Sequence, residues 1–444
     1  MALVDTAATL LRIAQLRRHD TWSRERLRRH QARMLAALLD HALARSPFYR
    51  RAYRAAGAGR DTPLAGLPPV DKTTIMANFD EVVTDPRLRL ADLEAHLERV
   101  SGDELYLGTY RVIGTGGTSG VRGVLAYDRP AWALSVAGAL RTGAFMDLRA
   151  RRGRRLRVAS VTTTDPVHWS ARYAATAGLG VTASLHLDAR TPTVRLVAAL
   201  NRHRPDLLEC YPSIAAALAR EQLEGRLRIR PRAVATSGEP RTEHTLGLMR
   251  AAWGDALFDG YATTETGLAG MECTRHRGIH LLEDLTIFEV EDRRVLVTNL
   301  VNRTIPLVRY ELSDMLTLAG DPCPCGRPWR LVTTIAGRSE DLLRLRTASG
   351  APLEVHPTAL TGPLERRAGL RAFRVVHDPG ALVVAVVPAP GVDPAVLARD
   401  VAAELEGVLR GLGVVRCPVR VEPAARIDRV GAAGKAKLVE ERAR

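Results

Sequence analysis

Cysteine and long apolar runs are both scarce in this sequence of 444 residues. The five cysteines, Cys210, Cys273, Cys323, Cys325 and Cys417, are too few for a disulfide framework in a chain of this length. No apolar run approaches the roughly 20 residues of a membrane-spanning helix. The apolar patch near the N-terminus is short and precedes its basic residues, which is unlike a signal peptide. We therefore expect a cytoplasmic protein with no membrane partner.

Lysine is also scarce, although the chain is basic. Lys+Arg total 64 against 49 for Asp+Glu, a formal net charge of +15, and arginine supplies most of the excess. This balance permits binding of nucleic acid or of anionic ligands. The arginines are scattered, with one dense run from Arg149 to Arg157. We expect no nucleic-acid partner, and a zinc-stabilised nucleic-acid-binding protein is kept as the alternative from a different class.

The length and the order of apolar segments predict a multidomain α/β protein. Residues 21–60 show helical spacing, and Ser46-Pro47 ends that run, with a loop after it. From about residue 110, strands alternate with helices. The expected strands are 157–162, 206–211, 233–237, 256–261 and 295–300, and the expected helices are 133–145, 194–203, 214–223 and 242–253. Towards the C-terminus we expect strands at 381–388 and 419–421 around a helix at 395–409.

A loop rich in glycine and hydroxyl groups stands between two expected strands. It reads Thr115, Gly116, Gly117, Thr118, Ser119, Gly120. Amides that turn inward without a Cβ, together with hydroxyls, suit a phosphate. The loop is not a P-loop, because Val121 follows Gly120. It also lacks the dinucleotide fingerprint, because a strand-like segment follows instead of a helix. The pattern alone is equally compatible with a hairpin turn.

Polar turns follow several of the expected strands, where ligands bind in α/β domains. These turns are Tyr211-Pro212-Ser213, then Ser237, Gly238, Glu239 and Pro240, then Tyr261 to Gly267. Glu265 could hold Mg²⁺ against a phosphate. Asp314 follows an apolar-aromatic strand and could accept both hydroxyls of a ribose, or could form a turn or a helix cap.

Cysteines and histidines make a separate constellation. Cys273 and His280, with His276 between them, precede Cys323-Pro324-Cys325-Gly326. Two thiolates in a Cys-x-Cys turn and a distant Cys/His pair can supply four ligands to tetrahedral Zn²⁺. The spacing is not the common Cys-x2-Cys, so the pattern alone leaves the metal open, as it leaves open whether His276 replaces His280. Such a site would be structural, since four protein ligands leave no open position.

In this order, the motifs resemble those of the adenylate-forming enzymes, and within them the phenylacetate–coenzyme A ligase-like branch, which includes capsule-cluster synthetases. The resemblance runs from the Phe48 region to Gly434-Lys435. It implies that Thr115 to Gly120 bind the ATP phosphates and that Tyr211 and Ser237 to Pro240 face the substrate and the adenine. It further implies these roles: Tyr261 for the nucleotide, Thr264 for the α-phosphate, Glu265 for Mg²⁺, Asp314 and Arg338 for the ribose, Asp341 as hinge and Lys435 as catalytic lysine, with Lys437 as its rival. Some relatives carry cysteines like Cys273, Cys323 and Cys325.

The sequence departs from the family pattern at several places. Val121 or Arg122 replaces the usual lysine of the phosphate loop, and Ala262 replaces a glycine. Glu311-Leu312-Ser313 replaces the middle of the ribose element, and the apolar loop expected after the hinge reads Leu345 to Gly350.

The resemblance implies a large layered α/β adenylation domain over 1–340, with a helical cap over 1–75, and a small mobile α+β domain over 341–444. It implies that ATP and Mg²⁺ activate a carboxylic acid to an acyl-adenylate, and that the acyl group passes to the thiol of coenzyme A. Amide formation with an amine acceptor is the alternative within this chemistry. His168, Trp169 and Tyr211 are candidate pocket residues for the acid, and they favour an aromatic or flat acid only slightly. A homodimer is left open.

Overall fold

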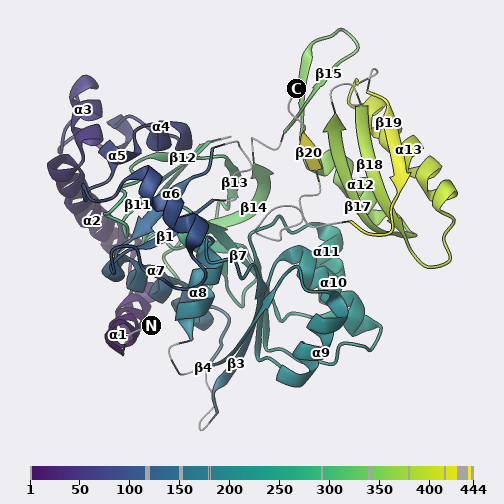
Figure 1. Cartoon of the computed structure of the whole chain (residues 1–444), viewed down its shortest axis with the longest axis horizontal. Coiled ribbons are helices and arrows are strands. Elements are labelled where there is room, and N and C mark those ends of the chain that lie inside the picture. Colours follow the sequence, from purple (N-terminus) through teal and green to yellow (C-terminus); the bar gives the residue numbers. More distant parts are fainter. Residues whose placement is uncertain are drawn as a thin grey trace. The chain divides into compact units, whose positions relative to one another are not determined.

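The computed structural model describes residues 3–115, 121–149, 154–178, 180, 182–291, 294–338, 342–378, 381–414, 417–427 and 439–441 (Figure 1). The chain forms two compact units. The first comprises Met1–Pro240 and Leu248–Ala336, and the second comprises Arg241–Gly247 and Gly337–Arg444. Across the described ranges, no helix combines the length and the apolar character needed to cross a lipid bilayer.

The N-terminal part of the first unit is helical, as expected, but Ser46-Pro47 acts differently from the prediction. Ser23 caps α2, and Ser46 both ends α2 and caps α3, where its Oγ accepts from the backbone N–H of Tyr49. Pro47 favours a helix start because its fixed φ suits the first turn. The expected loop after Ser46 is therefore a helix. The helices here are α1 (Leu3–Arg17), α2 (Arg24–Arg45), α3 (Pro47–Ala55), α4 (Lys72–Ala77), α5 (Phe79–Val82) and α6 (Leu90–Arg99), with the 3-10 turns Arg18–Thr21 and Leu64–Gly66.

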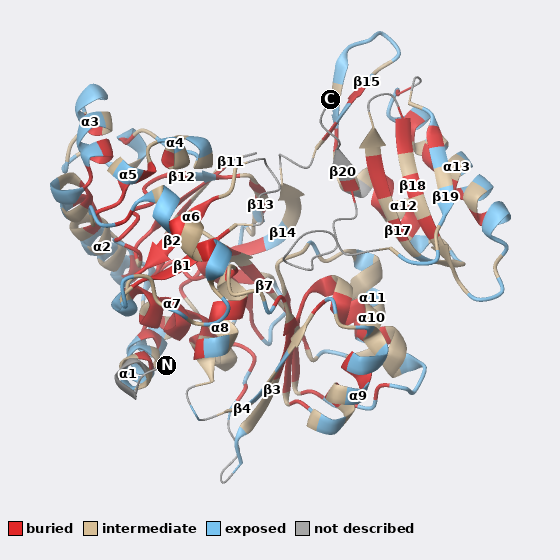
Figure 2. Cartoon of the chain, viewed as in Figure 1, coloured by how far each residue is buried: buried red, intermediate tan, exposed pale blue. Residues whose placement is uncertain are grey.

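A long mixed sheet organises the first unit. Among the described residues it has nine strands in the order β13-β14-β9-β8-β7-β6-β5-β3-β4. The strands from β4 to β7 are parallel, and those from β7 through β8 and β9 to β14 pair antiparallel. Figure 2 shows buried residues along the central strand β7, whereas the edge strand β4 has none. Their bounds are β3 (Leu156–Thr162), β4 (Thr182–Asp188), β5 (Leu207–Cys210), β6 (Ala233–Ser237), β7 (Leu257–Thr263), β8 (Gly267–Glu272), β9 (Ile279–Leu281), β13 (Asp314–Leu318) and β14 (Leu331–Arg338).

Two smaller sheets and the connecting helices complete this unit. A hairpin is formed by β1 (Arg111–Gly114) and β2 (Val124–Tyr127), and a second sheet by β10 (Thr286–Glu291), β11 (Arg294–Asn299) and β12 (Tyr310–Leu312). The helices are α7 (Arg129–Arg141), α8 (Trp169–Ala177), α9 (Thr193–His203) and α10 (Pro212–Leu223), with the 3-10 turn Thr142–Ala144. The first residues of α11 (Glu243–Trp253), up to Gly247, are grouped with the second unit, and the rest with the first. The alternation of strands and helices that the sequence predicts is confirmed, whereas β4 and α8 were not predicted.

A buried ion pair joins the N-terminal helices to the body of the first unit. The Arg141 guanidinium donates to both oxygens of Asp284 at 2.7 and 2.8 Å, and His19 Nδ1 lies 2.7 Å from the same carboxylate. Burial alone would raise the pKa of Asp284, but Arg141 and His19 hold it well below its usual value. Removal of one partner would leave an uncompensated buried charge, which typically costs about 3–5 kcal/mol.

The second unit has its own hydrophobic core. A four-stranded sheet, in the order β19-β18-β17-β20, carries α12 and α13, and β15 and β16 form a separate hairpin. The expected strand at 381–388 is β18, with those bounds. The elements are β15 (Leu343–Arg346), β16 (Pro352–Val355), α12 (Pro357–Arg366), β17 (Leu370–Asp378), β18 (Ala381–Pro388), α13 (Pro394–Gly411), β19 (Val419–Pro423) and β20 (Val439–Glu441). This mixture of strands and helices agrees with the expected α+β class.

Candidate active site

The turn between β7 and β8 positions Glu265. The Glu265 carbonyl oxygen accepts from Asn299 Nδ2 at 2.8 Å and from the Tyr127 hydroxyl at 3.5 Å. Within the turn, Thr263 Oγ1 lies 2.9 Å from Thr266 Oγ1 and accepts from the Thr266 backbone N–H. These bonds fix the backbone of the turn, including the half-buried Thr264, and leave the Glu265 carboxylate to face the adjacent pocket.

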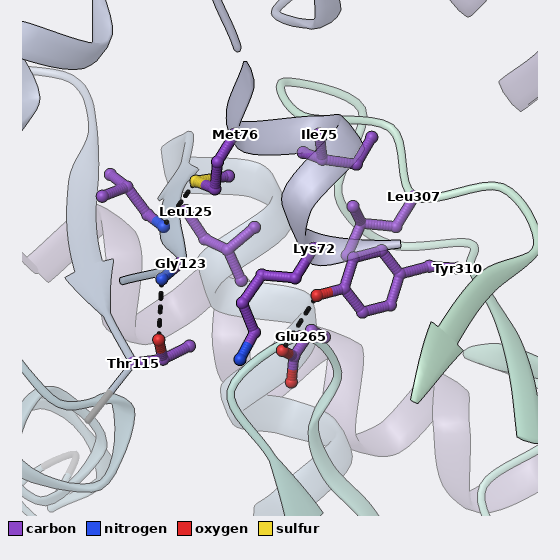
Figure 3. A pocket seen from close by; sticks show the side chains of 10 residues that line it. Lys72, Ile75, Met76, Thr115, Gly123, Leu125, Glu265, Leu307 and Tyr310 are labelled. Carbon is purple, nitrogen blue, oxygen red and sulfur yellow. Dashed lines mark hydrogen bonds between the residues drawn. The ribbon is translucent and has the colours of Figure 1, made fainter. Parts of the chain in front are cut away.

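That pocket brings together residues that lie far apart in the chain. Figure 3 shows the side chains of Lys72, Thr115, Glu265 and Tyr310 pointing toward one another, with apolar side chains behind them. The Tyr310 hydroxyl lies 3.4 Å from Glu265 Oε1. The apolar lining is Ile75, Met76, Val124, Leu125 and Leu307. A cation, a carboxylate and hydroxyls around one space can bind a polyphosphate and its metal ion.

Thr115 is the only residue of the predicted phosphate loop that the structure describes. Its Oγ1 accepts from the Gly123 backbone N–H at 2.7 Å, and its own N–H donates to the Gly123 carbonyl oxygen at 2.8 Å. The loop therefore begins and ends at the β1–β2 hairpin, beside the pocket. Gly116, Gly117, Thr118, Ser119 and Gly120 lie outside the described residues.

Lys72 was not predicted as a site residue. Its place is fixed by distant pairing, because the Val70 N–H donates to the Arg309 carbonyl oxygen and the Glu311 N–H donates to the Val70 carbonyl oxygen. Asp71 then caps α4 by accepting from the Thr74 N–H at 2.7 Å. One signal in the sequence could have found it. The chain has only three lysines, and the other two are Lys435 and Lys437.

Two other predicted site residues contact each other. The Tyr261 hydroxyl donates to Asp314 Oδ2 at 2.8 Å, and both side chains are buried. Three strands lie between β7 and β13 in the order of the large sheet, so this contact joins two strands that are not neighbours. One Asp314 carboxylate oxygen is thereby oriented by Tyr261.

The turns predicted to face the substrate and the adenine are also joined. The Ser213 backbone N–H donates to Glu239 Oε2 at 3.0 Å, which ties the start of α10 to the turn after β6. That turn runs from Ser237 through Gly238, which has a φ of +82°, to Pro240. The Tyr211 hydroxyl accepts from the Thr163 backbone N–H at 3.2 Å, and burial raises its pKa.

Of the remaining predicted residues, the structure describes His168 and Arg338. His168 is buried at the N-terminal end of α8. Arg338 ends β14 and is grouped with the second unit. Asp341, Lys435 and Lys437 lie outside the described residues.

The four predicted metal ligands form a compact cluster. The ligand atoms of Cys273, His280, Cys323 and Cys325 all lie within 4.8 Å of one another. Cys273 Sγ is 3.8 Å from Cys323 Sγ and 3.3 Å from His280 Nε2, and Cys325 Sγ is 3.5 Å from His280 Nε2. His276 lies elsewhere, with its ring against Phe258 and its Nδ1 3.6 Å from Glu272.

These distances fit a tetrahedral ion. Zn–S bonds of about 2.3 Å and Zn–N bonds of about 2.0–2.1 Å imply Sγ–Sγ and Sγ–N separations of about 3.8 and 3.5 Å. A sulfur–sulfur distance of 3.8 Å is much too long for a disulfide bond. Burial, and secondarily the charge of Arg327, lowers the pKa of His280 to about 4, so that its imidazole is neutral and can act as a ligand.

Comparison with known proteins gives consistent relatives. No protein-family model matches the chain. A phenylacetate–coenzyme A ligase of Thermus thermophilus is 28% identical over 386 residues, which cover 78% of this chain and 77% of the relative. A phenylacetate–coenzyme A ligase of Pseudomonas putida is 26% identical over 383 residues, which cover 77% of each chain.

Solved structures share the fold. A 2-hydroxyisobutyryl-CoA ligase in the postadenylation state, in complex with R3-HIB-AMP, matches with a TM-score of 0.73 at 20% identity, covering 96% of this chain and 91% of that one. The amide bond synthetase McbA from Marinactinospora thermotolerans matches with a TM-score of 0.50 at 18% identity, covering 72% and 66%. The curated relatives and the shared fold confirm the predicted resemblance of this chain to the adenylate-forming enzymes, and within them to the phenylacetate–coenzyme A ligase-like branch.

Proposed function

We propose that this protein joins a carboxylic acid to coenzyme A through an acyl-adenylate. The carboxylate oxygen attacks the α-phosphorus of ATP, the bond to the β-phosphate breaks and pyrophosphate leaves. The coenzyme A thiolate then attacks the acyl carbonyl carbon, and AMP leaves. Curated relatives that carry out acid–thiol ligation, aligned over three quarters of the chain, support this reaction.

The observation that carries the proposal is the convergence of predicted nucleotide residues around the β7–β8 turn. Glu265 faces the pocket with Thr115, and Tyr261 orients Asp314. We assign Glu265 to a Mg²⁺ ion on the phosphates and Thr264 to the α-phosphate. We assign Asp314, with Arg338, to the ribose hydroxyls. Mg²⁺ would neutralise charge on the phosphate oxygens, and Glu265 is a suitable oxygen ligand for it.

Lys72 supplies the cation that the phosphate loop lacks. The residues after Gly120 are Val121 and Arg122, where the family carries a lysine. The Lys72 ammonium reaches into the pocket beside Thr115 and Glu265 (Figure 3). A compact ammonium neutralises phosphate charge as a point charge, whereas a guanidinium binds phosphate through a planar bidentate fork. We propose that Lys72 binds the departing pyrophosphate and that Lys435 acts on the α-phosphate.

An amine acceptor remains the second candidate, because an amide bond synthetase shares this fold. Both candidates have the same first half-reaction and differ only in the group that attacks the adenylate. An acceptor screen with coenzyme A and a set of amines, run on one acid that supports adenylation, separates them. Release of AMP only with amines would replace the thiol by an amine in the proposal.

Glu265→Gln should abolish acid-dependent exchange of pyrophosphate into ATP. The amide keeps the size of the side chain but is a poor ligand for Mg²⁺, so we expect a loss of at least about 10²-fold. The measurement is isotope exchange across a panel of acids, which also tests the proposed function itself. Glu224→Gln, at an exposed site after α10, is the control and should exchange normally. Full exchange in Glu265→Gln would remove Glu265 from the reaction.

Lys72→Ala and Lys435→Ala should both slow adenylate formation, by roughly 10²–10³-fold if each removes a donor that stabilises developing charge. Transfer from chemically prepared acyl-adenylate to coenzyme A should stay near normal in both variants. Pyrophosphate leaves only in the first step, so the second step does not need the charge that these lysines supply. The two half-reactions are assayed separately by pyrophosphate release and thioester formation. Normal adenylation in either variant would reject that lysine, and equal loss of both steps would point to misfolding.

Asp314→Ala should raise the KM for ATP with a smaller effect on kcat, because the lost contacts are to the ribose and not to the reacting phosphorus. Tyr261→Phe removes only the hydroxyl that orients Asp314, so the same change should appear at smaller size. Steady-state kinetics at varied ATP measure both. An unchanged ATP dependence in Asp314→Ala would show that the ribose lies elsewhere.

We propose further that Cys273, His280, Cys323 and Cys325 hold one structural Zn²⁺. Elemental analysis should find about one Zn²⁺ per chain, because four protein ligands close the site. Cys323→Ser should lose the metal and lower the Tm, whereas Cys417→Ser, whose thiol lies outside the cluster, should keep both. Purified wild-type protein that contains no metal and keeps its Tm in strong chelator would contradict the assignment.

A further inference from the structure

A carboxyl group, that of Glu209, lies within the large sheet without a cationic partner. Glu209 is on β5, beside Ser160 of β3 in the parallel register, and Ser160 Oγ donates to Glu209 Oε2 at 2.7 Å. In the ranges that the structure describes, this neutral hydroxyl is the only hydrogen-bond partner of the carboxyl, and no basic side chain pairs with it. The second oxygen, Oε1, therefore keeps its capacity to accept a hydrogen bond.

The surroundings make this position costly for a carboxyl group. In the sheet register its neighbour on β6 is Ala235, which is buried, and the next residue along is the buried Phe258 on β7. Burial raises the pKa of Glu209, and its bond with Ser160 only partly opposes that shift. On its other side the same row continues through Ser160 to His186 on β4, so this face carries polar as well as apolar side chains. A half-buried carboxyl with one neutral partner and a raised pKa is a candidate for a functional site.

Helix α8 packs against β3, the strand that pairs with β5 at Glu209, and it carries two aromatic side chains. The rings of Trp169 and Tyr173 stack with centroids 5.0 Å apart and an interplanar angle of 9°. Burial, and secondarily the charge of Glu209, raises the pKa of Tyr173 well above its usual value. The Trp169 Nε1 is buried and has no hydrogen-bond partner among the described residues. The stacked pair thus has one buried polar atom without a described partner, Trp169 Nε1, and its Tyr173 member is close enough to Glu209 to feel that charge.

The same aromatic wall touches the catalytic turn. Gly267 ends the turn that carries Glu265 and has a φ of +71°. A Cβ at Gly267 would lie 3.0 Å from ring atoms of Trp169, so only glycine allows this approach. Trp169 therefore connects the place where the acid would react with the region that contains Glu209.

We propose that Glu209 recognises a hydrogen-bond donor at the far end of the acid substrate, and that the substrate class is an aromatic carboxylic acid with a hydroxyl or amino group on its ring. This inference rests on the proposed function. The ring lies along Trp169 and Tyr173, and the donor binds the oxygen of Glu209 that Ser160 leaves available. A site built to pair with a donor rejects the analogue that lacks it, because the buried acceptor then stays unpaired.

The experiment compares matched acids in the pyrophosphate exchange assay with the full-length protein. The probes are phenylacetate, its 3- and 4-hydroxy and 3- and 4-amino derivatives, 4-methoxyphenylacetate and a set of aliphatic acids. We expect kcat/KM for at least one hydroxy or amino acid to exceed that for phenylacetate by roughly 10- to 100-fold. The methoxy acid adds bulk and oxygen without a donor and should gain no such preference.

Two variants tie the preference to Glu209. Glu209→Ala should reduce the ratio of kcat/KM values for donor and parent acid to about one. Glu209→Gln keeps an acceptor oxygen in the same volume and should retain part of the ratio for the hydroxy acid. Glu224→Ala, at an exposed glutamate, should leave the ratio unchanged. Thermal unfolding curves establish that each variant is folded, and the ratio within one variant does not depend on its active fraction.

The outcomes separate this inference from the proposed function. Exchange with aromatic acids but no preference for donors, equal preference for the methoxy acid, or a ratio that survives in Glu209→Ala each overturn the role of Glu209 alone. Exchange only with aliphatic acids overturns the substrate class and leaves the ligase reaction in place. Exchange with no acid of the panel overturns the proposed function and this inference with it.

Discussion

The backbone of the β7–β8 turn is the constraint on which the rest of the site depends. Its Glu265 carbonyl oxygen is held by Asn299 from β11 and Tyr127 from β2, and Gly267 at its end lies against Trp169 of α8. Two parts of the chain therefore fix the Glu265 peptide carbonyl, and a third contacts the end of the same turn. Because other contacts fix this backbone, little conformational entropy of the turn is lost when the Glu265 carboxylate binds a ligand.

The proposed metal cluster supports the same strand from its other end. Strand β8 begins at Gly267, in the turn, and ends at Glu272, next to Cys273. The other ligands come from β9 and from the loop between β13 and β14, so an ion here would connect three segments of the chain beside the antiparallel part of the sheet. A metal site with no catalytic role can then still influence activity, since loosening the end of a short strand shifts the turn at its start.

Local sequence patterns were sufficient to predict those elements whose formation depends on residues near one another in the chain. Alternating apolar runs with turn residues at both ends gave the bounds of β6 and β18, and the clustering of Cys273, His280, Cys323 and Cys325 follows the predicted set. Tyr261 and Asp314 were both predicted to bind the nucleotide, but their contact with each other was not predicted. Sequence reasoning failed where distant pairing decides. Lys72 enters the pocket because Val70 pairs with Tyr310, and nothing near Lys72 in the sequence encodes that register.

The treatment of buried acids separates structural groups from ligand-binding groups in this protein. Asp284 is paired with Arg141, and Glu283 accepts from Arg330 at 2.7 and 2.8 Å, so each buried charge has a cation beside it. Neither of these carboxylates has a reason to meet a ligand. Glu209, which is half-buried, differs from them, since a serine hydroxyl is its only described partner. Asp314, which we assign to the ribose, also has a neutral partner, the Tyr261 hydroxyl. Both acids proposed to bind a substrate group thus have a hydroxyl beside them, so a donor from the ligand can complete their hydrogen bonds.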